Sequence, residues 1–322
     1  MDYLSMLSLH VFRTVMETGT FAAAAGKLYI SQPAVSGHIH RLEKQLGVVL
    51  FETPYGRKLK PTVACNLLYE YAIEIAVKNA DLANLLKGDT AGERGRLSLA
   101  FSSSATALSS LVGKFAKEYP DIQIIVRNPS STSGREALKK GDIDIGFFPY
   151  FDEHQLQCFP IFEEPMEIIC SPDHPLAQYD YITVDNLHRQ IFVACIEGAD
   201  YNRLLEAFLT ASGISYQESA IRVENGGAIL RVVEQGYGLG LLAYSTLEQS
   251  LKMGSVTCLT PSHRLPYTFI KTYLFFRSNY KLSATHKLFL SFIYENIRKY
   301  YPYFIMHSPD YLQATEPAAH AE

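Results

Sequence analysis

The chain has 322 residues, of which 48% are hydrophobic and 19% are charged, and its formal net charge is −4. This composition is ordinary for a water-soluble globular protein of two or three domains. No apolar run approaches the roughly 20 residues of a membrane-spanning helix and the N-terminus has no signal peptide, so we expect a cytoplasmic protein with no membrane partner.

The cysteines are odd in number and widely spaced, and no CxxC pair occurs. They are Cys65, Cys158, Cys170, Cys195 and Cys258. This spacing argues against a disulfide framework and a zinc site, so we expect reduced, buried and inert thiols. The ten histidines are scattered, and no motif of a hydrolase or metalloprotease is present. We therefore expect no catalytic residue, no metal and no cofactor.

Charge is distributed unevenly along the chain. Residues 1–62, which we call the reader, contain 7 Lys and Arg and 4 Asp and Glu, whereas the remainder contains 22 and 29. A small basic module joined to a larger acidic part favours a DNA-binding domain with a separate second function. Chance variation in surface charge is the alternative explanation.

The first 46 residues are typical of a helix-turn-helix. Apolar residues at helical spacing predict a first helix over residues 4–17, and Thr20 can cap a second helix over residues 21–28. Ser31 is placed to cap a third helix. Pro33 then falls in the first turn of that helix, where its missing N–H is not needed.

The third helix has two contrasting faces. An apolar stripe is formed by Val35, Ile39, Leu42 and Leu46. The residues that we expect to contact DNA are Ser31, Gln32, Pro33, Ser36, Gly37, His40 and Arg41. Small polar groups precede cations, which suits a helix whose first half enters the major groove and whose second half meets phosphates. Gly37 costs about 1 kcal/mol relative to alanine, but it would allow close approach to the bases; a plain exposed helix with one poor residue is the alternative.

Residues 46–62 predict a β-hairpin wing. Two β-rich pieces surround a Pro-Tyr-Gly turn, and Arg57, Lys58 and Lys60 follow that turn. We expect Arg57 and Lys58 to contact the DNA backbone.

Residues 61–88 predict one uninterrupted helix. Its apolar stripe consists of Leu67, Leu68, Tyr71, Ile75, Leu82, Leu85 and Leu86. The stripe is too long for a small domain to bury, so we expect it to pair with a second copy of the chain. Such a dimer presents two recognition helices to a two-fold DNA site.

These features resemble the LysR-type transcriptional regulators. The matching residues are Gln32-Pro33-Ala34-Val35-Ser36, Leu42-Glu43, Leu46-Gly47 and Leu50-Phe51-Glu52, in the order and spacing of the family motif. The chain departs from the family at Gly37 and His38, at Thr53 and at Cys65. Two cations that family members often use on DNA are therefore absent, so their base preference does not transfer to this chain.

From Arg96 onward strands alternate with helices, after a glycine-rich and charged break at residues 87–95. The predicted strands are 96–101, 122–128, 143–148, 166–170, 191–195, 219–225, 238–242 and 273–277, and the first two helices are 105–119 and 132–140. This alternation predicts an α/β fold with parallel sheets, whose ligands bind at the carboxyl ends of the strands.

The resemblance extends to this part through residues 114–124, 138–147, 171–177 and 232–242. It implies a two-lobed effector domain that is similar to periplasmic solute-binding proteins. The expected domains are the reader (1–62), a dimerising linker helix and hinge (63–92), an effector-binding domain (93–302) and a partly disordered tail (303–322). Within the effector domain we expect lobe I at 93–165 and 268–302, and lobe II at 166–267.

Polar residues follow three strands and precede three helices. The residues expected to bind the effector are Ser102, Ser103, Ser104, Ser130, Ser131, Thr132, Phe148, Arg203, Asn225 and Gly226. Helix N-termini favour negative charge, so an anionic effector is expected, and Arg203 can add a full positive charge. For the Ser, Thr and Asn residues the alternative is simple helix capping. For Phe148 the alternative is a place in the core.

The whole chain therefore predicts a sequence-specific, effector-controlled transcriptional regulator. Its expected partners are double-stranded promoter or operator DNA, a small anionic effector and, for an activator, RNA polymerase. The family resemblance implies a homotetramer built as a dimer of dimers. A solute-binding protein without a regulatory role is the alternative function.

Overall fold

Two units divide the chain, Met1–Ala83 and Asn84–Glu322. The computed structural model describes residues 4–52, 59–87, 92–102, 105–149, 153–216, 220–263, 265–266, 269–278 and 280–307. Within these ranges no helix is both long and apolar enough to cross a membrane.

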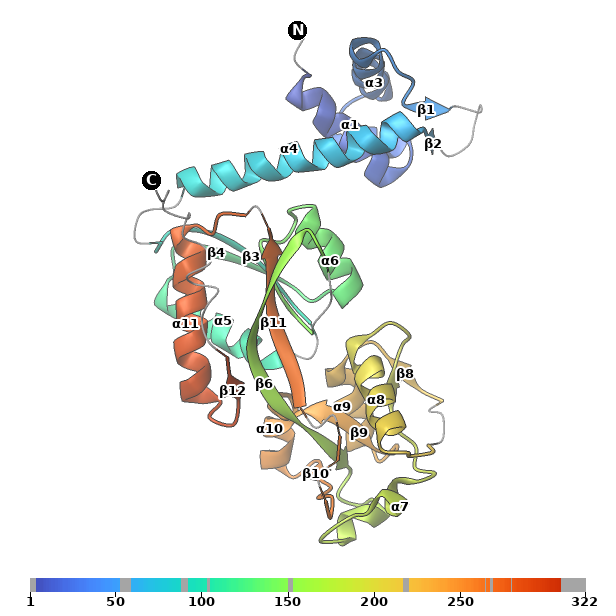
Figure 1. Ribbon diagram of the computed structural model, residues 1–322, viewed down its shortest axis with the longest axis vertical. Coiled ribbons are helices and arrows are strands. Elements are labelled where there is room, and N and C mark those ends of the chain that lie inside the picture. Colours follow the sequence, from blue (N-terminus) through green and yellow to red (C-terminus); the bar gives the residue numbers. More distant parts are fainter. Residues whose placement is uncertain are drawn as a thin grey trace, which may run out of the picture. The chain divides into compact units, whose positions relative to one another are not determined.

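Three capped helices and a short hairpin build the reader (Figure 1). They are α1 (Met6–Thr18), α2 (Phe21–Leu28), α3 (Gln32–Leu46), β1 (Phe51–Glu52) and β2 (Lys60–Pro61). The hydroxyls of Thr20 and Ser31 accept hydrogen bonds from backbone N–H groups of α2 and α3, and Pro33 lies in the first turn of α3. Both predicted caps are confirmed. A cap can be predicted from sequence because the capping side chain and the N–H that it binds lie within four consecutive residues.

The buried stripe of α3 is shorter than predicted. Val35, Ile39 and Leu42 are almost completely buried, but Leu46 is 38% exposed. Beyond it the chain reverses at Gly47, whose φ of 67° lies in the left-handed region. Glu43 holds this turn, because its Oε1 accepts a hydrogen bond from the N–H of Leu50 at 2.8 Å.

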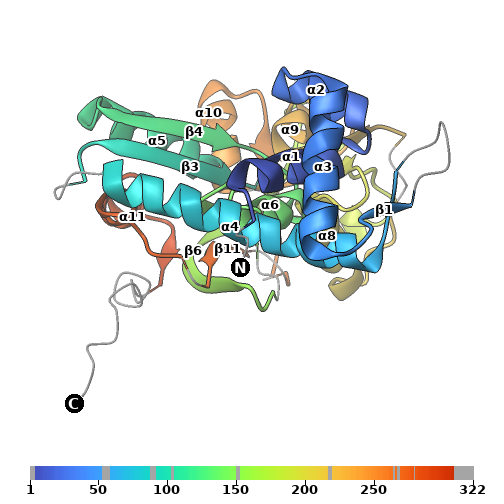
Figure 2. The ribbon, with the colours of Figure 1, turned by 90° about the horizontal axis from the view of Figure 1, so that it is seen from above.

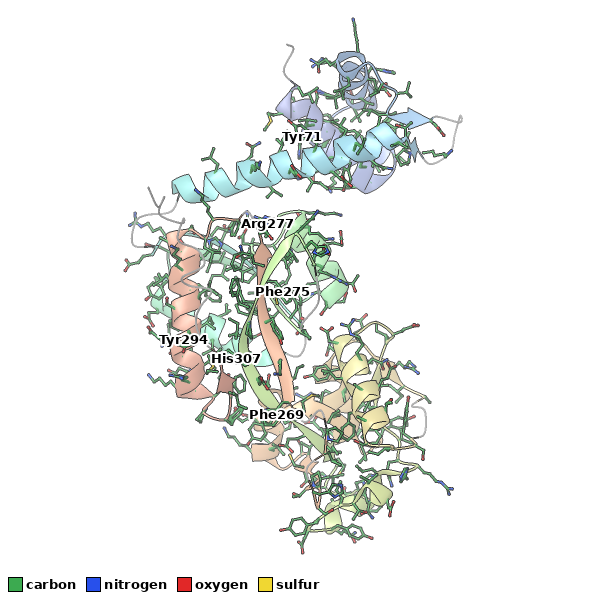
Figure 3. All side chains as sticks on the ribbon, viewed as in Figure 1. Tyr71, Phe269, Phe275, Arg277, Tyr294 and His307 are labelled. Atoms are coloured by element: carbon green, nitrogen blue, oxygen red, sulfur yellow. The ribbon has the colours of Figure 1, made fainter. Side chains whose placement is uncertain are left out.

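The long helix α4 (Val63–Lys87) divides its apolar residues between two faces. Leu68 and Ala72 are buried against the core of the reader. Leu67 and Tyr71 are 65% and 51% exposed, and Leu82 is 54% exposed. These three residues are spaced by 4 and 11 positions, so they lie on one side of the helix, where Figure 3 labels Tyr71.

Lobe I is a sheet covered by helices on both faces (Figure 1). Its strands and helices are β3 (Gly95–Phe101), α5 (Thr106–Glu118), β4 (Ile122–Arg127), α6 (Ser131–Lys139), β5 (Ile145–Phe148) and α11 (Ala284–Tyr300). Strand β3 pairs in parallel with β4 and β5, and β4 forms the edge of the sheet in Figure 2. One core joins α5 and α11 to the sheet, and a second core lies under α6.

Two long strands connect the lobes, β6 (Leu156–Cys170) and β11 (Phe269–Arg277). They pair antiparallel, from Leu156 opposite Arg277 to Pro165 opposite Phe269, and Figure 3 labels Phe269, Phe275 and Arg277 along β11. The prediction of parallel sheets is therefore wrong for this part of the molecule. The sequence pattern also missed the first ten residues of β6, because they alternate too little to indicate a strand.

In the described part of lobe II, short strands and helical segments follow β6. They are η1 (Pro175–Gln178), α7 (Val184–Leu187), β7 (Ala194–Cys195), α8 (Asp200–Ala211), β8 (Arg222–Val223), α9 (Gly226–Glu234), β9 (Gly240–Ala243), α10 (Tyr244–Met253) and β10 (Thr257–Cys258). Strands β9 and β10 pair antiparallel with β6, while β7 and β8 pair in parallel. Strands β7 and β8 are shorter than the predicted ones.

The segment after α11 folds back on the body of the chain. Tyr301 and Phe304 are buried, and β12 (Ile305–Met306) pairs antiparallel with β6. His307 Nε2 lies 3.1 Å from Glu163 Oε1 and is labelled in Figure 3. Residues 308–322, most of the tail that was expected to be partly disordered, lie outside the described residues.

Strand β6 carries a fully buried carboxylate, Glu164. Its Oε2 accepts a hydrogen bond from the N–H of Ser245 in the first turn of α10 at 3.2 Å, while Oε1 has no hydrogen-bond partner among the described residues. Burial disfavours the ionised form and raises the pKa of Glu164 from 4.5 to about 7, although the hydrogen bond from the Ser245 N–H opposes this shift.

This shift predicts a pH-dependent stability. In the unfolded chain Glu164 ionises near its ordinary pKa of 4.5, but the folded protein holds the proton until about pH 7. The free energy of unfolding should therefore fall as the pH rises between these values, and Glu164→Gln should remove up to about 3 kcal/mol of this loss. Urea unfolding at a series of pH values measures it. Glu248→Gln, which removes a carboxylate paired with Lys252, is the control, and equal pH slopes for Glu164→Gln and wild type would contradict the prediction.

Candidate functional site

The exposed face of α3 contains the residues expected to contact DNA. Ser31, Gln32, Pro33, Gly37, His40 and Arg41 are exposed, and Ser36 is half-buried. They lie opposite the buried stripe of Val35, Ile39 and Leu42, so the apolar face anchors the helix while the polar face remains free. The structure thus brings the α3 members of the predicted set onto one surface.

The carboxylate of Glu43 contacts the end of this face that carries the cations. His40 Nδ1 lies 3.1 Å from Glu43 Oε2, and the other oxygen of the same carboxylate holds Leu50. No ion pair among the described residues involves Arg41 or Lys44, so neither cation is neutralised by an ion pair within the described part of the chain. Both can meet phosphates.

Gly37 lies in the middle of this face, and no contact among the described residues requires a glycine there. A Cβ added at Gly37 would have no atom within 4 Å among the described residues, and its φ is not positive. Among the described residues, tight packing therefore does not offset the cost of a glycine inside a helix.

The wing is present as a hairpin, since Phe51 pairs with Pro61 and Glu52 with Lys60. Its tip, with Arg57 and Lys58, lies outside the described residues.

In the second unit, some of the predicted effector residues lie where α6 of lobe I meets α8 of lobe II. Ser131, the first residue of α6, is 3% exposed. Its hydroxyl donates a hydrogen bond that is shared between both carboxylate oxygens of Asp200, the first residue of α8, at 2.7 Å each. This contact joins the two lobes directly.

Asp200 is also paired within its own helix. The guanidinium of Arg203 forms an ion pair with the Asp200 carboxylate. The side chain of Asp200 is 4% exposed and that of Arg203 is 54% exposed. The predicted cation is therefore in place but already has an anionic partner. The sequence analysis named Arg203 and missed the role of Asp200, because only the fold brings Ser131 to it.

Asn225 and Gly226 open α9 beside this contact. Asn225 is exposed, and its side-chain oxygen accepts a hydrogen bond from the N–H of Ala228 at 3.0 Å, so it is a helix cap. Gly226 is buried, and an added Cβ would lie 2.5 Å from the ring of Tyr201, the neighbour of Asp200. Close packing on Tyr201 therefore explains the glycine, and it brings the N-terminus of α9 next to the first turn of α8.

The remaining predicted residues have different places. Ser130 caps α6 and Thr132 is exposed in its first turn, whereas Ser102 is 2% exposed at the end of β3. Phe148 is completely buried in the core under α6 and fills the space beside Gly134 and Gly146. Phe148 is thus a core residue, which corrects the expectation that it binds the effector. Ser103 and Ser104 lie outside the described residues.

A cavity of about 380 Å³ lies elsewhere in lobe II and contains none of the predicted residues. It is lined mainly by apolar side chains, among them Phe208, Leu241 and Leu259, together with the half-buried carboxylate of Glu167. Neither Ser131 nor Asp200 belongs to its lining.

Ser283, His286 and Asp144 form an arrangement that resembles a catalytic triad. Ser283 Oγ lies 2.6 Å from His286 Nδ1, and His286 Nε2 lies 3.5 Å from Asp144. His286 is completely buried and Ser283 caps α11, so the group stabilises the start of that helix. The hydrogen bond from His286 helps to keep the pKa of Asp144 below its ordinary value, although burial opposes the shift.

The thiols lack the features of reactive cysteines. Burial raises the pKa of Cys65, Cys170 and Cys195 to about 11, and of Cys158 and Cys258 to about 12. Such thiols are almost entirely protonated near neutral pH. Among the described residues no group of three His, Cys, Asp or Glu side chains is arranged to bind a metal ion.

Two family models match the chain. Residues 6–66 match the bacterial regulatory helix-turn-helix protein of the lysR family, and residues 90–298 match the LysR substrate binding domain.

Individual proteins with similar sequences or folds agree with this assignment. A probable RuBisCO transcriptional regulator from Cyanidium caldarium is 27% identical over 253 residues, which is 76% of this chain and 80% of that protein. A full-length OxyR variant from Pseudomonas aeruginosa has the same fold, with a TM-score of 0.69 at 18% identity over 96% of this chain and 100% of that one. The regulatory domain of CcmR from Synechocystis was solved in complex with 2-PG. The match to it spans 64% of this chain and 98% of that domain, with a TM-score of 0.57 and 20% identity.

The open space around Gly37 predicts opposite effects of Gly37→Ala on stability and on DNA binding. Gly37→Ala should raise the free energy of unfolding of the reader by up to about 1 kcal/mol, because alanine favours the helix and meets no atom. The same change should weaken DNA binding by about tenfold or more if the methyl group obstructs the bases. Gel shifts on a duplex selected by the wild type and thermal unfolding measure the two effects. Gly26→Ala in α2, which is equally unobstructed, is the control; unchanged DNA affinity for Gly37→Ala would refute the close approach.

Proposed function

The chain belongs to the LysR family of bacterial helix-turn-helix regulators, and on that premise we propose that an anionic effector bound between its two lobes controls DNA binding or transcription. The match to both family models favours a DNA-binding regulator over a solute-binding protein without a regulatory role. The family consists of DNA-binding regulators.

The reader binds promoter or operator DNA through the exposed face of α3. Gln32 and Ser36 contact base edges, Gly37 permits the approach, and His40 and Arg41 meet phosphates. Arg57 and Lys58 of the wing contact the neighbouring backbone. Support comes from the exposure of this face and from the absence of an ion pair on Arg41 among the described residues.

The effector lies where the first turns of α6 and α8 meet. The observation that carries this proposal is the hydrogen bond between Ser131 of lobe I and a carboxylate of lobe II. It means that donors from the two lobes converge on one negatively charged group, next to the cation of Arg203. The CcmR regulatory domain, which shares the fold, was solved with 2-PG, so 2-PG is a suitable first compound to test.

Ser131→Ala should weaken effector binding without affecting DNA binding. A lost hydrogen bond to a buried anion costs roughly 1–3 kcal/mol, and the reader lies in the other unit. Thermal unfolding with 2-PG and a panel of small carboxylates identifies the effector, because a ligand at 100 times its Kd stabilises by roughly 2.7 kcal/mol. Ser133→Ala, which changes an exposed hydroxyl of the same helix, is the control. An identical ligand-induced shift in Ser131→Ala and wild type would place the effector elsewhere.

We further propose that the exposed stripe of Leu67, Tyr71 and Leu82 on α4 pairs with a second copy, and that two dimers form a tetramer. Support comes from the exposure of three large apolar side chains on one side of this helix. Isolated exposed apolar residues are common, but an ordered stripe is typical of an interface.

Replacing Leu67 by Glu should dissociate the dimer, because the charge would be buried without a partner in the paired helices. Analytical ultracentrifugation should show at least about a tenfold weaker self-association than wild type. Asn66→Glu introduces the same charge at an exposed position on another side of α4 and should leave the assembly intact. A Leu67→Glu protein that assembles like wild type would exclude this stripe from the interface.

A further inference from the structure

The contact between Ser131 and Asp200 is a buried, charged contact between lobes. Both oxygens of Asp200 lie 2.7 Å from the Ser131 hydroxyl, and both residues are less than 10% exposed. Strands β6 and β11 join the lobes covalently, but this contact joins them through side chains at the first turns of two helices.

The donors around this carboxylate are those that an external anion would use. Ser131 supplies a hydroxyl at the N-terminus of α6, and Arg203 supplies a guanidinium. Asp200 itself lies in the first turn of α8, and Ala199 in the N-cap position provides no side-chain acceptor. The partial positive charges of both helix N-termini therefore act on the Asp200 carboxylate.

We infer that Asp200 is an internal anion that occupies the anionic subsite of the effector and keeps the first turns of α6 and α8 in contact until the effector displaces it. This inference rests on the proposed effector site between the lobes. A serine hydroxyl has one proton to donate, so Ser131 cannot serve Asp200 and a ligand with equal strength. Two negative groups at one set of donors also repel each other at short range.

The exposure of the partners indicates how the exchange proceeds. The side chain of Arg203 is 54% exposed, so it can turn from Asp200 toward an incoming carboxylate or phosphate while it stays solvated. The side chain of Asp200 is 4% exposed, so it can leave Ser131 only when the first turns of α6 and α8 separate. Effector binding is thereby coupled to a movement of lobe II relative to lobe I about β6 and β11. A ligand without an anionic group has nothing to exchange for Asp200 and does not open the contact.

Isothermal titration calorimetry of the full-length protein with inorganic phosphate tests this inference. Asp200→Asn removes the internal charge at nearly constant shape, so phosphate should bind about tenfold more tightly than in wild type, the value of one charge-assisted hydrogen bond. The gain should disappear in the double variant Asp200→Asn with Ser131→Ala. Glu206→Gln, which removes a carboxylate from the same helix, should bind phosphate like wild type.

Equal phosphate affinity in wild type and Asp200→Asn, a gain that persists without the Ser131 hydroxyl, or no phosphate binding by any variant would each overturn the inference. An Asp200→Ser variant replaces Asp200→Asn if the latter does not fold. The test is separate from that of the proposed function. A wild-type protein that binds 2-PG through Ser131, but whose Asp200→Asn variant gains no affinity for phosphate, retains the effector site and refutes the internal anion.

Discussion

The antiparallel pair of β6 and β11 is the constraint on which the rest of the second unit depends. It runs from Leu156 and Arg277 to Pro165 and Phe269, and beyond it β6 continues into lobe II, where β9 and β10 join it. Because both lobes share these strands, the N-termini of α6 and α8 are brought to one place although they are far apart in sequence. A movement between the lobes must twist this pair of strands, which limits the change that an effector can cause.

Buried charge has two different solutions in this molecule. Asp200 is surrounded by a hydroxyl and a guanidinium, so its negative charge is compensated at the contact between the lobes. Glu164 has only the first turn of α10 as a donor and keeps one oxygen without a partner among the described residues, so its pKa rises instead. A buried ionisable group is either paired or neutralised, and the structure uses both outcomes. The paired carboxylate can respond to another anion, whereas the neutralised one responds to protons.

In the reader, the residues that fix α3 in place are different from the residues on its exposed face. Glu43 ties the end of α3 to Leu50, and the buried stripe fixes the helix on α1 and α2. The opposite face then carries residues that contribute little to stability, such as Gly37, and are available for contact with DNA. The same division recurs on α4, where Leu68 stabilises the reader and Leu67 remains exposed.

The sequence by itself determined the local elements. The caps Thr20 and Ser31, the proline of α3 and the extent of α4 were predicted correctly, because each signal lies within a few residues of its effect. The resemblance to a family supplied the two-lobed architecture. Only the tertiary structure decided that β6 and β11 run antiparallel, that Phe148 belongs to the core and that Asp200 holds Ser131. Strand pairing, burial and a hydrogen bond between residues 69 positions apart arise from the packing of distant segments, and no local periodicity encodes them.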